Sequence, residues 1–176
     1  MRILIALIVA VTGLWLSPEP PPTTVEEVPA PRFASIDDAL RFISRKVDVP
    51  VGLPPLPDNA KLQSDNPVIV SRTRGVTTGY LYLTIGPRRP LILSYGVSGF
   101  DGCGGDDARE VDVNGQLGLL ATSPGHRWSS IIWPANRETL EGRYGLSGGI
   151  GPDRALAWAR AMDRAVTAPD RPATGC

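Results

Sequence analysis

The stretch AREVDVNGQLGLLATSPGHRWSSIIW, residues 108–133, decides the fold that the sequence predicts. Asn114 and Gly115 separate two apolar, β-prone runs, and both residue types tolerate the positive φ of a tight hairpin turn. A third β-prone run follows at 131–133. The stretch therefore predicts an antiparallel meander, with strands at 110–113, 117–120 and 131–133.

The register of this hairpin depends on the turn length. A two-residue turn pairs Val113 with Gln116 and places Leu117 on the face opposite Val111. A three-residue turn closed by Gly115 instead pairs Leu117 with Val111 across the two strands, so that their side chains lie on the same face and the apolar residues are gathered there. We expect the three-residue turn.

Two helices are predicted on either side of the strands. Ser35 and Asp38 have capping-box spacing, and they precede an apolar helical stripe of Ile36, Ala39, Leu40, Ile43 and Val47. A second helix begins at Pro152 and carries the stripe Ala155, Trp158, Ala159, Met162 and Val166. Between the helices, apolar residues alternate with a period of two from residue 67. The predicted fold class is α+β, an antiparallel β-sheet meander covered by an N-terminal and a C-terminal helix.

The domain organisation follows from the N-terminal composition. Residues 1–16 have the pattern of a signal peptide or signal-anchor, because a basic start precedes the apolar run 3–16. As a helix this run is roughly 21 Å long, which is short against a hydrocarbon core of roughly 30 Å. Residues 17–34 are a Pro-rich stalk, 35–168 a single domain and 169–176 a C-terminal tail. We therefore expect an extracytoplasmic bacterial protein, secreted or anchored to the cytoplasmic membrane, whose membrane contact is through residues 3–16.

The extended segment 49–62 contains prolines among apolar residues. Its apolar side chains need burial, so we expect an arm held along the domain rather than a flexible linker.

Charge and cysteine content restrict the partners. The 18 basic and 18 acidic residues cancel, so no overall field favours nucleic acid. Cys103 and Cys176 are the only cysteines, and in an oxidising compartment we expect them to form a disulfide, either within the chain or between two chains.

Candidate catalytic and metal-binding residues are few. Ser147 lies in a literal G-x-S-x-G, but the only histidine, His126, precedes it, and the strands are antiparallel rather than parallel. Asp101, Asp106 and Asp107 do not have EF-hand spacing. We expect no catalytic residue, metal or cofactor, and we keep a small serine hydrolase using Ser147 as the alternative.

Aromatic side chains on the predicted strands are the candidate binding surface. Some of them could line a groove between sheet and helices, although core packing is the more common role of such residues. The candidates are Tyr80, Tyr82, Trp128, Trp133 and Tyr144.

The order of several motifs from residue 35 to residue 166 resembles the bacterial domain-of-unknown-function family 4367. The motifs are DDALRFISRK, VGLPPLPDNAKL, GYLYLTIG, REVDVNGQLGLL, SSIIWP, GRYGLSGG and ALAWARAM. The resemblance implies an extracytoplasmic α+β module, often carried by single-span membrane proteins, and it transfers no catalytic residue. Together these features predict a non-enzymatic binding or sensory module for an envelope protein, a peptide or an apolar ligand.

Overall fold

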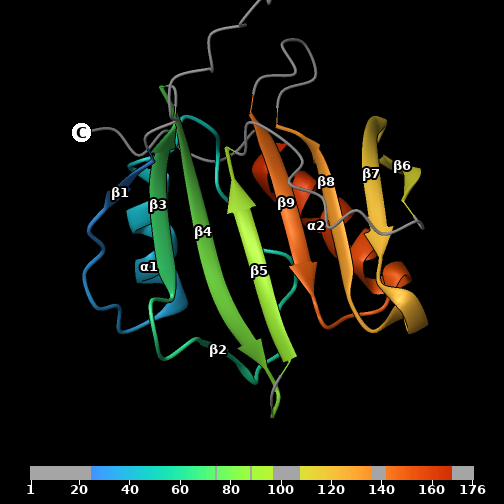
Figure 1. The fold of residues 1–176 in the computed structure, drawn as a ribbon, viewed down its shortest axis with the longest axis horizontal. Helices are drawn as coiled ribbons and strands as arrows, with labels where there is room; N and C mark the ends of the chain where they lie inside the picture. The colour runs from blue at the N-terminus through green and yellow to red at the C-terminus, as the bar shows by residue number, and fades with distance from the viewer. Residues whose placement is uncertain (1–24, 74, 88, 97–107, 136–141, 168–176) are drawn as a thin grey trace, which may run out of the picture.

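A computed structural model describes residues 25–73, 75–87, 89–96, 108–135 and 142–167, whose fold is shown in Figure 1. These residues form, in chain order, β1 Glu26–Val28, α1 Ile36–Ser44, β2 Ala60–Leu62, β3 Val68–Thr73, β4 Val76–Ile85, β5 Arg89–Tyr95, β6 Arg109–Val113, β7 Gln116–Thr122, the short 3₁₀ helix η1 Pro124–His126, β8 Ser129–Pro134, β9 Arg143–Gly148 and α2 Pro152–Thr167.

All described strands belong to one nine-stranded antiparallel sheet. Its order is β1-β3-β4-β5-β9-β8-β7-β6, with β2 paired to β4 outside this path. Strand β9 lies between β5 and β8, so it joins the β3–β5 strands to the β6–β8 strands. A pairing between strands so distant in sequence cannot be read from local turn signals.

Both described helices pack on the same face of this sheet (Figure 1). Helix α1 contacts β3 and β4, whereas α2 contacts the strands from β6 to β9. Alternating side chains of the sheet form the core on this face, and they are fully buried in the row Leu81, Leu93, Leu146, Ile131 and Leu120. We call the opposite face, on which no described helix lies, the front face.

The predicted fold class is wrong. The described chain is mostly a nine-stranded antiparallel sheet with two helices, and it is not an α+β fold whose sheet an N-terminal helix covers. The reason is one of size: the nine residues of α1 span roughly 14 Å. The eight strands of the main path extend over roughly 34 Å at 4.8 Å spacing. Nor is the sheet a simple meander, because β9 is inserted at its centre.

Two local predictions are confirmed. The Oγ of Ser35 accepts a hydrogen bond from the backbone N–H of Asp38, so Ser35 is the N-cap of α1 as its spacing indicates. The proline-containing arm is held along the domain by two tyrosine hydroxyls. Tyr95 donates to the carbonyl oxygen of Gly52 at 2.8 Å, and Tyr144 donates to that of Pro50 at 2.9 Å.

The predicted three-residue turn of the β6–β7 hairpin is wrong. Val113 pairs with Gln116, and Asn114 and Gly115 form a two-residue turn with φ of 51° and 85°. The prediction that all apolar side chains of the hairpin share one face is wrong, because the face of β7 toward α2 carries the polar Gln116 and the front face carries the apolar Leu117. Gln116 is directed toward α2, where it finds a buried hydrogen-bond partner, and Leu117 lies on the front face with 66% of its surface exposed.

Several other predictions concern residues outside the described ranges. These are the signal segment 1–16, residues 17–24 of the stalk, the acidic candidates Asp101, Asp106 and Asp107, both cysteines and the tail. Within the stalk, Glu26–Val28 form β1 and pair with β3. Among the described residues, no helix is both long and apolar enough to cross a membrane.

Candidate functional site

The candidate site lies where strands β7 and β8 separate. Their pairing runs from Thr122↔Ser129 to Leu119↔Ile132 and ends there. Beyond this point β8 continues beside β9, with Trp133 opposite Tyr144, while the first residues of β7 pair only with β6. We call the opening between the two strands the fork.

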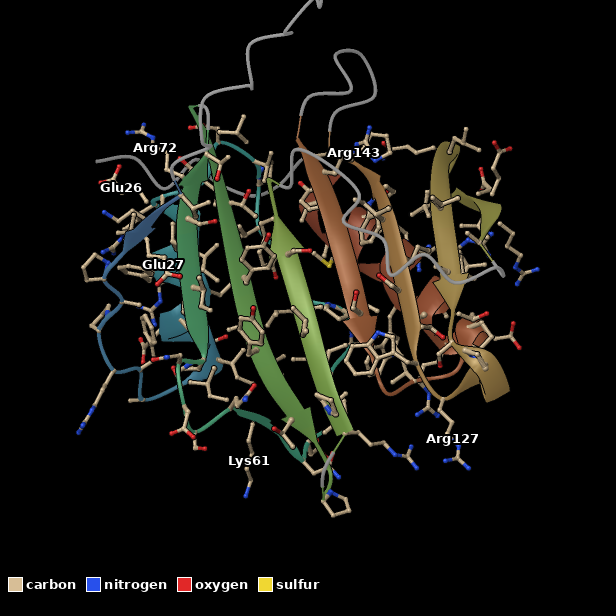
Figure 2. All side chains as sticks on the ribbon, viewed as in Figure 1. Glu26, Glu27, Lys61, Arg72, Arg127 and Arg143 are labelled. Atoms are coloured by element: carbon tan, nitrogen blue, oxygen red, sulfur yellow. The ribbon has the colours of Figure 1, made fainter. Side chains whose placement is uncertain are left out.

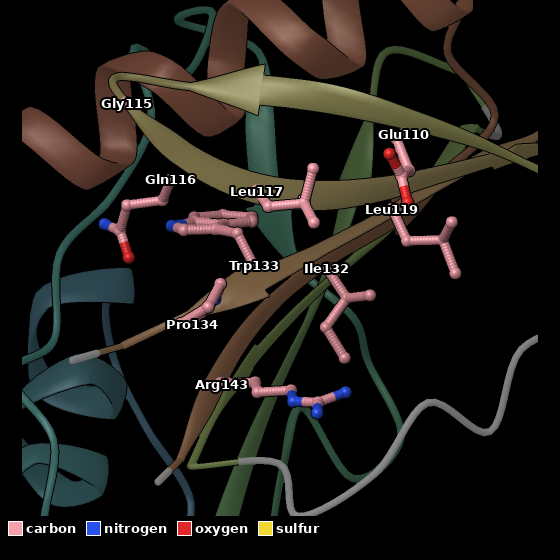
Figure 3. Close-up of a pocket in the computed structure, with 10 residues that line it drawn as sticks. Glu110, Gly115, Gln116, Leu117, Leu119, Ile132, Trp133, Pro134 and Arg143 are labelled. Atoms are coloured by element: carbon pink, nitrogen blue, oxygen red, sulfur yellow. The ribbon is translucent and has the colours of Figure 1, made fainter. Parts of the chain in front are cut away.

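A hollow of about 450 Å³ opens at the fork, mostly on the front face. This volume lies within the range of roughly 300–1,000 Å³ typical of small-molecule sites. Figure 3 shows the lining side chains, which are mainly apolar and come from four neighbouring strands and the hairpin turn. The lining consists of Glu110, Gly115, Gln116, Leu117, Gly118, Leu119, Ile132, Trp133, Pro134 and Arg143.

The fork opens because the hairpin turn is fastened to α2. Asn114 Nδ2 donates to the backbone carbonyl of Arg160 and to Asp163 Oδ2, both at 2.8 Å. Gln116 Nε2 donates to Asp163 Oδ1, also at 2.8 Å. Asp163 is only 1% exposed, so its carboxylate is a buried anchor for the turn. These bonds hold the start of β7 against α2 and away from the end of β8.

Two buried polar atoms at the fork have no hydrogen-bond partner among the described residues. They are Oε1 of Gln116, which is 6% exposed, and Nε1 of Trp133, which is 1% exposed. One atom accepts and the other donates, and Figure 3 shows the nitrogen side of the indole ring facing Gln116. An unmet buried polar atom costs about 1–3 kcal/mol. The described residues therefore leave one hydrogen-bond acceptor and one hydrogen-bond donor unsatisfied at the fork.

The rim of the hollow carries one charge of each sign. Figure 3 places the Arg143 guanidinium and the Glu110 carboxylate on opposite sides of the apolar group formed by Leu117, Leu119 and Ile132. Within the described ranges, neither Arg143 nor Glu110 forms an ion pair. Arg143 is half-buried, which makes it the more distinctive of the two charges.

The five predicted aromatic candidates do not form one surface. Tyr80 and Tyr82 are half-buried on the front face of β4, with ring centroids 6.4 Å apart. Trp128 is half-buried between η1 and β8. Trp133 lines the hollow, and the 1% exposed Tyr144 belongs to the core behind it, with ring centroids 5.5 Å apart.

The hydroxyl of Tyr144 is held in its neutral form. Burial and, second, the negative charge of Asp163 raise the pKa of Tyr144 well above its ordinary value. A neutral phenol can donate to the carbonyl of Pro50, so the shift favours the bond that holds the arm. Burial alone also raises the pKa of Tyr82 on the front face.

The described groups around Ser147 do not include the histidine base and carboxylate of a serine hydrolase. Its Oγ lies 2.6 Å from Oγ of Ser130 on the neighbouring strand, and no described carboxylate hydrogen-bonds to it. The side chain of His126 lies outside the described groups. In the described part of the chain, no cluster of His, Cys, Asp or Glu could hold a metal ion.

No family model matches the chain, and no curated protein or solved structure is found to be similar to it. The resemblance to domain-of-unknown-function family 4367 remains a prediction from the order of the motifs.

Sequence reasoning identified only Trp133 among the residues that carry the fork. It missed Gln116 and Asp163, since a side-chain pair 47 residues apart meets only in the folded chain. A signal was nevertheless present in Leu117 and Leu119. With a two-residue turn, these two apolar side chains lie on the face away from the core, where an unused apolar surface is costly.

Proposed function

We propose that this protein is a non-enzymatic extracytoplasmic binding module that takes an apolar ligand in the fork between β7 and β8. The observation that carries the binding part is the 450 Å³ hollow, which combines apolar walls with two buried polar atoms that no described residue satisfies. Soluble-protein pockets that bind ligands share this combination of apolar lining and a few fixed polar groups. Export to the envelope is supported by the signal pattern of residues 1–16.

The apolar wall gives a direct test of binding. We expect anilinonaphthalene sulfonate to fluoresce with the full chain, because its rings fit the apolar wall and its sulfonate complements Arg143. Leu117→Asp should weaken this binding at least about tenfold, since an exposed carboxylate replaces an apolar contact and repels the sulfonate. Leu117 is 66% exposed, so the substitution should leave the fold intact.

Val25→Asp is the matched control. Val25 is 57% exposed and precedes β1, at the opposite edge of the sheet from the fork. This variant should bind the dye as the wild type does. Equal binding by Leu117→Asp and the wild type would contradict the assignment of the site.

A further inference from the structure

The two unpartnered atoms at the fork restrict the chemistry of the ligand. Gln116 Oε1 can only accept a hydrogen bond, and Trp133 Nε1 can only donate one. Gln116 cannot exchange these roles by flipping its amide, because its Nε2 is engaged with Asp163 at 2.8 Å. A single group that meets both atoms must therefore donate and accept at the same time.

A charged head group cannot donate to Gln116 Oε1 and accept from Trp133 Nε1 at the same time. A carboxylate offers no donor to Gln116, and an ammonium offers no acceptor to Trp133. Either charge would also lose its hydration, and no described residue directs a free opposite charge at these two atoms, since both oxygens of Asp163 already accept hydrogen bonds. The inner end of the ligand is therefore neutral.

A water molecule can also donate and accept at the same time, but it buries no apolar surface when it enters the fork. In this structure neither atom is exposed to solvent, so a group reaches them only by entering between the two side chains. The burial of an apolar body against Leu119 and Ile132 supplies the driving force for that entry, at about 25 cal/mol per Å² of apolar surface. A hydroxyl on an apolar body makes the same two hydrogen bonds as a water molecule, and the body adds the burial of apolar surface that water does not supply.

We propose that the fork binds a neutral ligand whose apolar body lies on Leu117, Leu119 and Ile132 and whose hydroxyl group bonds Gln116 Oε1 and Trp133 Nε1. This inference rests on the proposed function, because it assigns the ligand class of the same site. A primary amide has the same pair of roles, and the hydroxyl is its smallest equivalent. The charges of Arg143 and Glu110 remain at the rim, outside this polar contact (Figure 3).

The test compares p-cresol with toluene, two probes of the same ring that differ in one hydroxyl. The full chain is titrated with each, and the indole N–H proton of Trp133 is followed by two-dimensional NMR. The chain has four tryptophans, so Trp133→Phe identifies the resonance by its loss. We expect p-cresol to shift this proton downfield and to bind about tenfold more tightly than toluene, which corresponds to one net hydrogen bond.

A second arm removes the donor. Followed through the Ile132 methyl resonances, Trp133→Phe should lose most of the preference for p-cresol over toluene. Trp158→Phe, on α2 and outside the fork lining, should keep it. Should Trp133→Phe fail to fold, the affinity ratio of the two probes for the wild type still decides.

The outcomes separate the two proposals. Failure of both probes to bind contradicts the proposed function itself. Equal binding of both probes, an unmoved indole proton, or an unchanged preference in a folded Trp133→Phe overturns the hydroxyl inference and leaves the apolar site standing.

Discussion

The two halves of the front face differ in the continuity of their strand pairing. On the β3–β5 side the pairing is unbroken, from Val68↔Leu81 to Thr73↔Val76 and from Gly79↔Tyr95 to Ile85↔Arg89. Figure 2 shows the side chains of this face of the sheet. On the β3–β5 half, Ile69 pairs with Tyr80 and Tyr82 with Ile92, and all four are half-buried. On the β6–β9 side the pairing of β7 with β8 stops at Leu119↔Ile132, and the hollow opens there.

The buried polar groups differ in the same way. The hydroxyl of Tyr95, under the continuous half, donates to the Gly52 carbonyl, whereas Trp133 and Gln116 at the fork each have one polar atom that no described residue satisfies. Apolar side chains on an uncovered sheet face are therefore not sufficient for a site. A site also needs a break in the strand pairing, and here the anchoring of the hairpin to α2 produces it.

The largest expected effect comes from removing that anchor. Asp163→Ala breaks the bonds from Asn114 and Gln116, so we expect the free energy of unfolding to fall by about 3 kcal/mol, at about 1.5 kcal/mol for each bond to a buried charge. Urea unfolding measures this change. Asp153→Ala, an exposed acid in the first turn of α2, should cost less than about 1 kcal/mol. Equal costs for the two variants would show that the anchor does not hold the hairpin.

An intermediate loss of stability is expected when the tyrosine hydroxyls that hold the arm are removed. Tyr95→Phe and Tyr144→Phe each leave an arm carbonyl without its hydroxyl donor, so each should lower the free energy of unfolding by about 1 kcal/mol. Their rings are in edge-to-face contact with centroids 6.4 Å apart, so the double variant should depart from additivity. Thermal or urea unfolding of the three variants tests this, and unchanged stability in both single variants would mean that the arm is held by apolar burial alone.

A smaller effect is expected at alkaline pH. Burial and then the charge of Asp163 raise the pKa of Tyr144 in the folded protein, whereas the unfolded chain ionises near the ordinary tyrosine pKa of about 10. The unfolded state then releases a proton that the folded state keeps, so the free energy of unfolding falls as pH rises above about 10. Tyr144→Phe should flatten this fall more than Tyr82→Phe, since Tyr82 is the less buried residue. A steeper or unchanged fall in Tyr144→Phe would contradict the assigned cause.

Local signals in the sequence were sufficient for the elements but not for their assembly. The Ser35 cap and the Asn114-Gly115 turn depend on neighbouring residues, and both were predicted. The register of the hairpin was predicted wrongly, because it is set by Gln116 meeting Asp163, a contact that sequence periodicity does not encode. The position of β9 between β5 and β8 was also not predicted, because it depends on pairing between strands that are distant in the sequence.

The candidate site was harder to predict than the strands. Trp133 was singled out as an aromatic residue, but its neighbours Leu117 and Leu119 were assigned to the core by the wrong register. Tyr144 was offered as a surface residue, and it is buried because its ring packs between Trp133 and Tyr95. The predicted bond between Cys103 and Cys176 lies outside the described residues and stays a prediction.

The most direct test of the central claim compares isoleucine methyl groups within one protein. Ile132 lines the fork, whereas Ile69 and Ile92 lie on the continuous half of the same face. On titration of the full chain with anilinonaphthalene sulfonate, we predict saturable shifts of the Ile132 methyl resonances and none at Ile69 or Ile92. Shifts of equal size at all three positions, or an unmoved Ile132, would contradict binding at the fork.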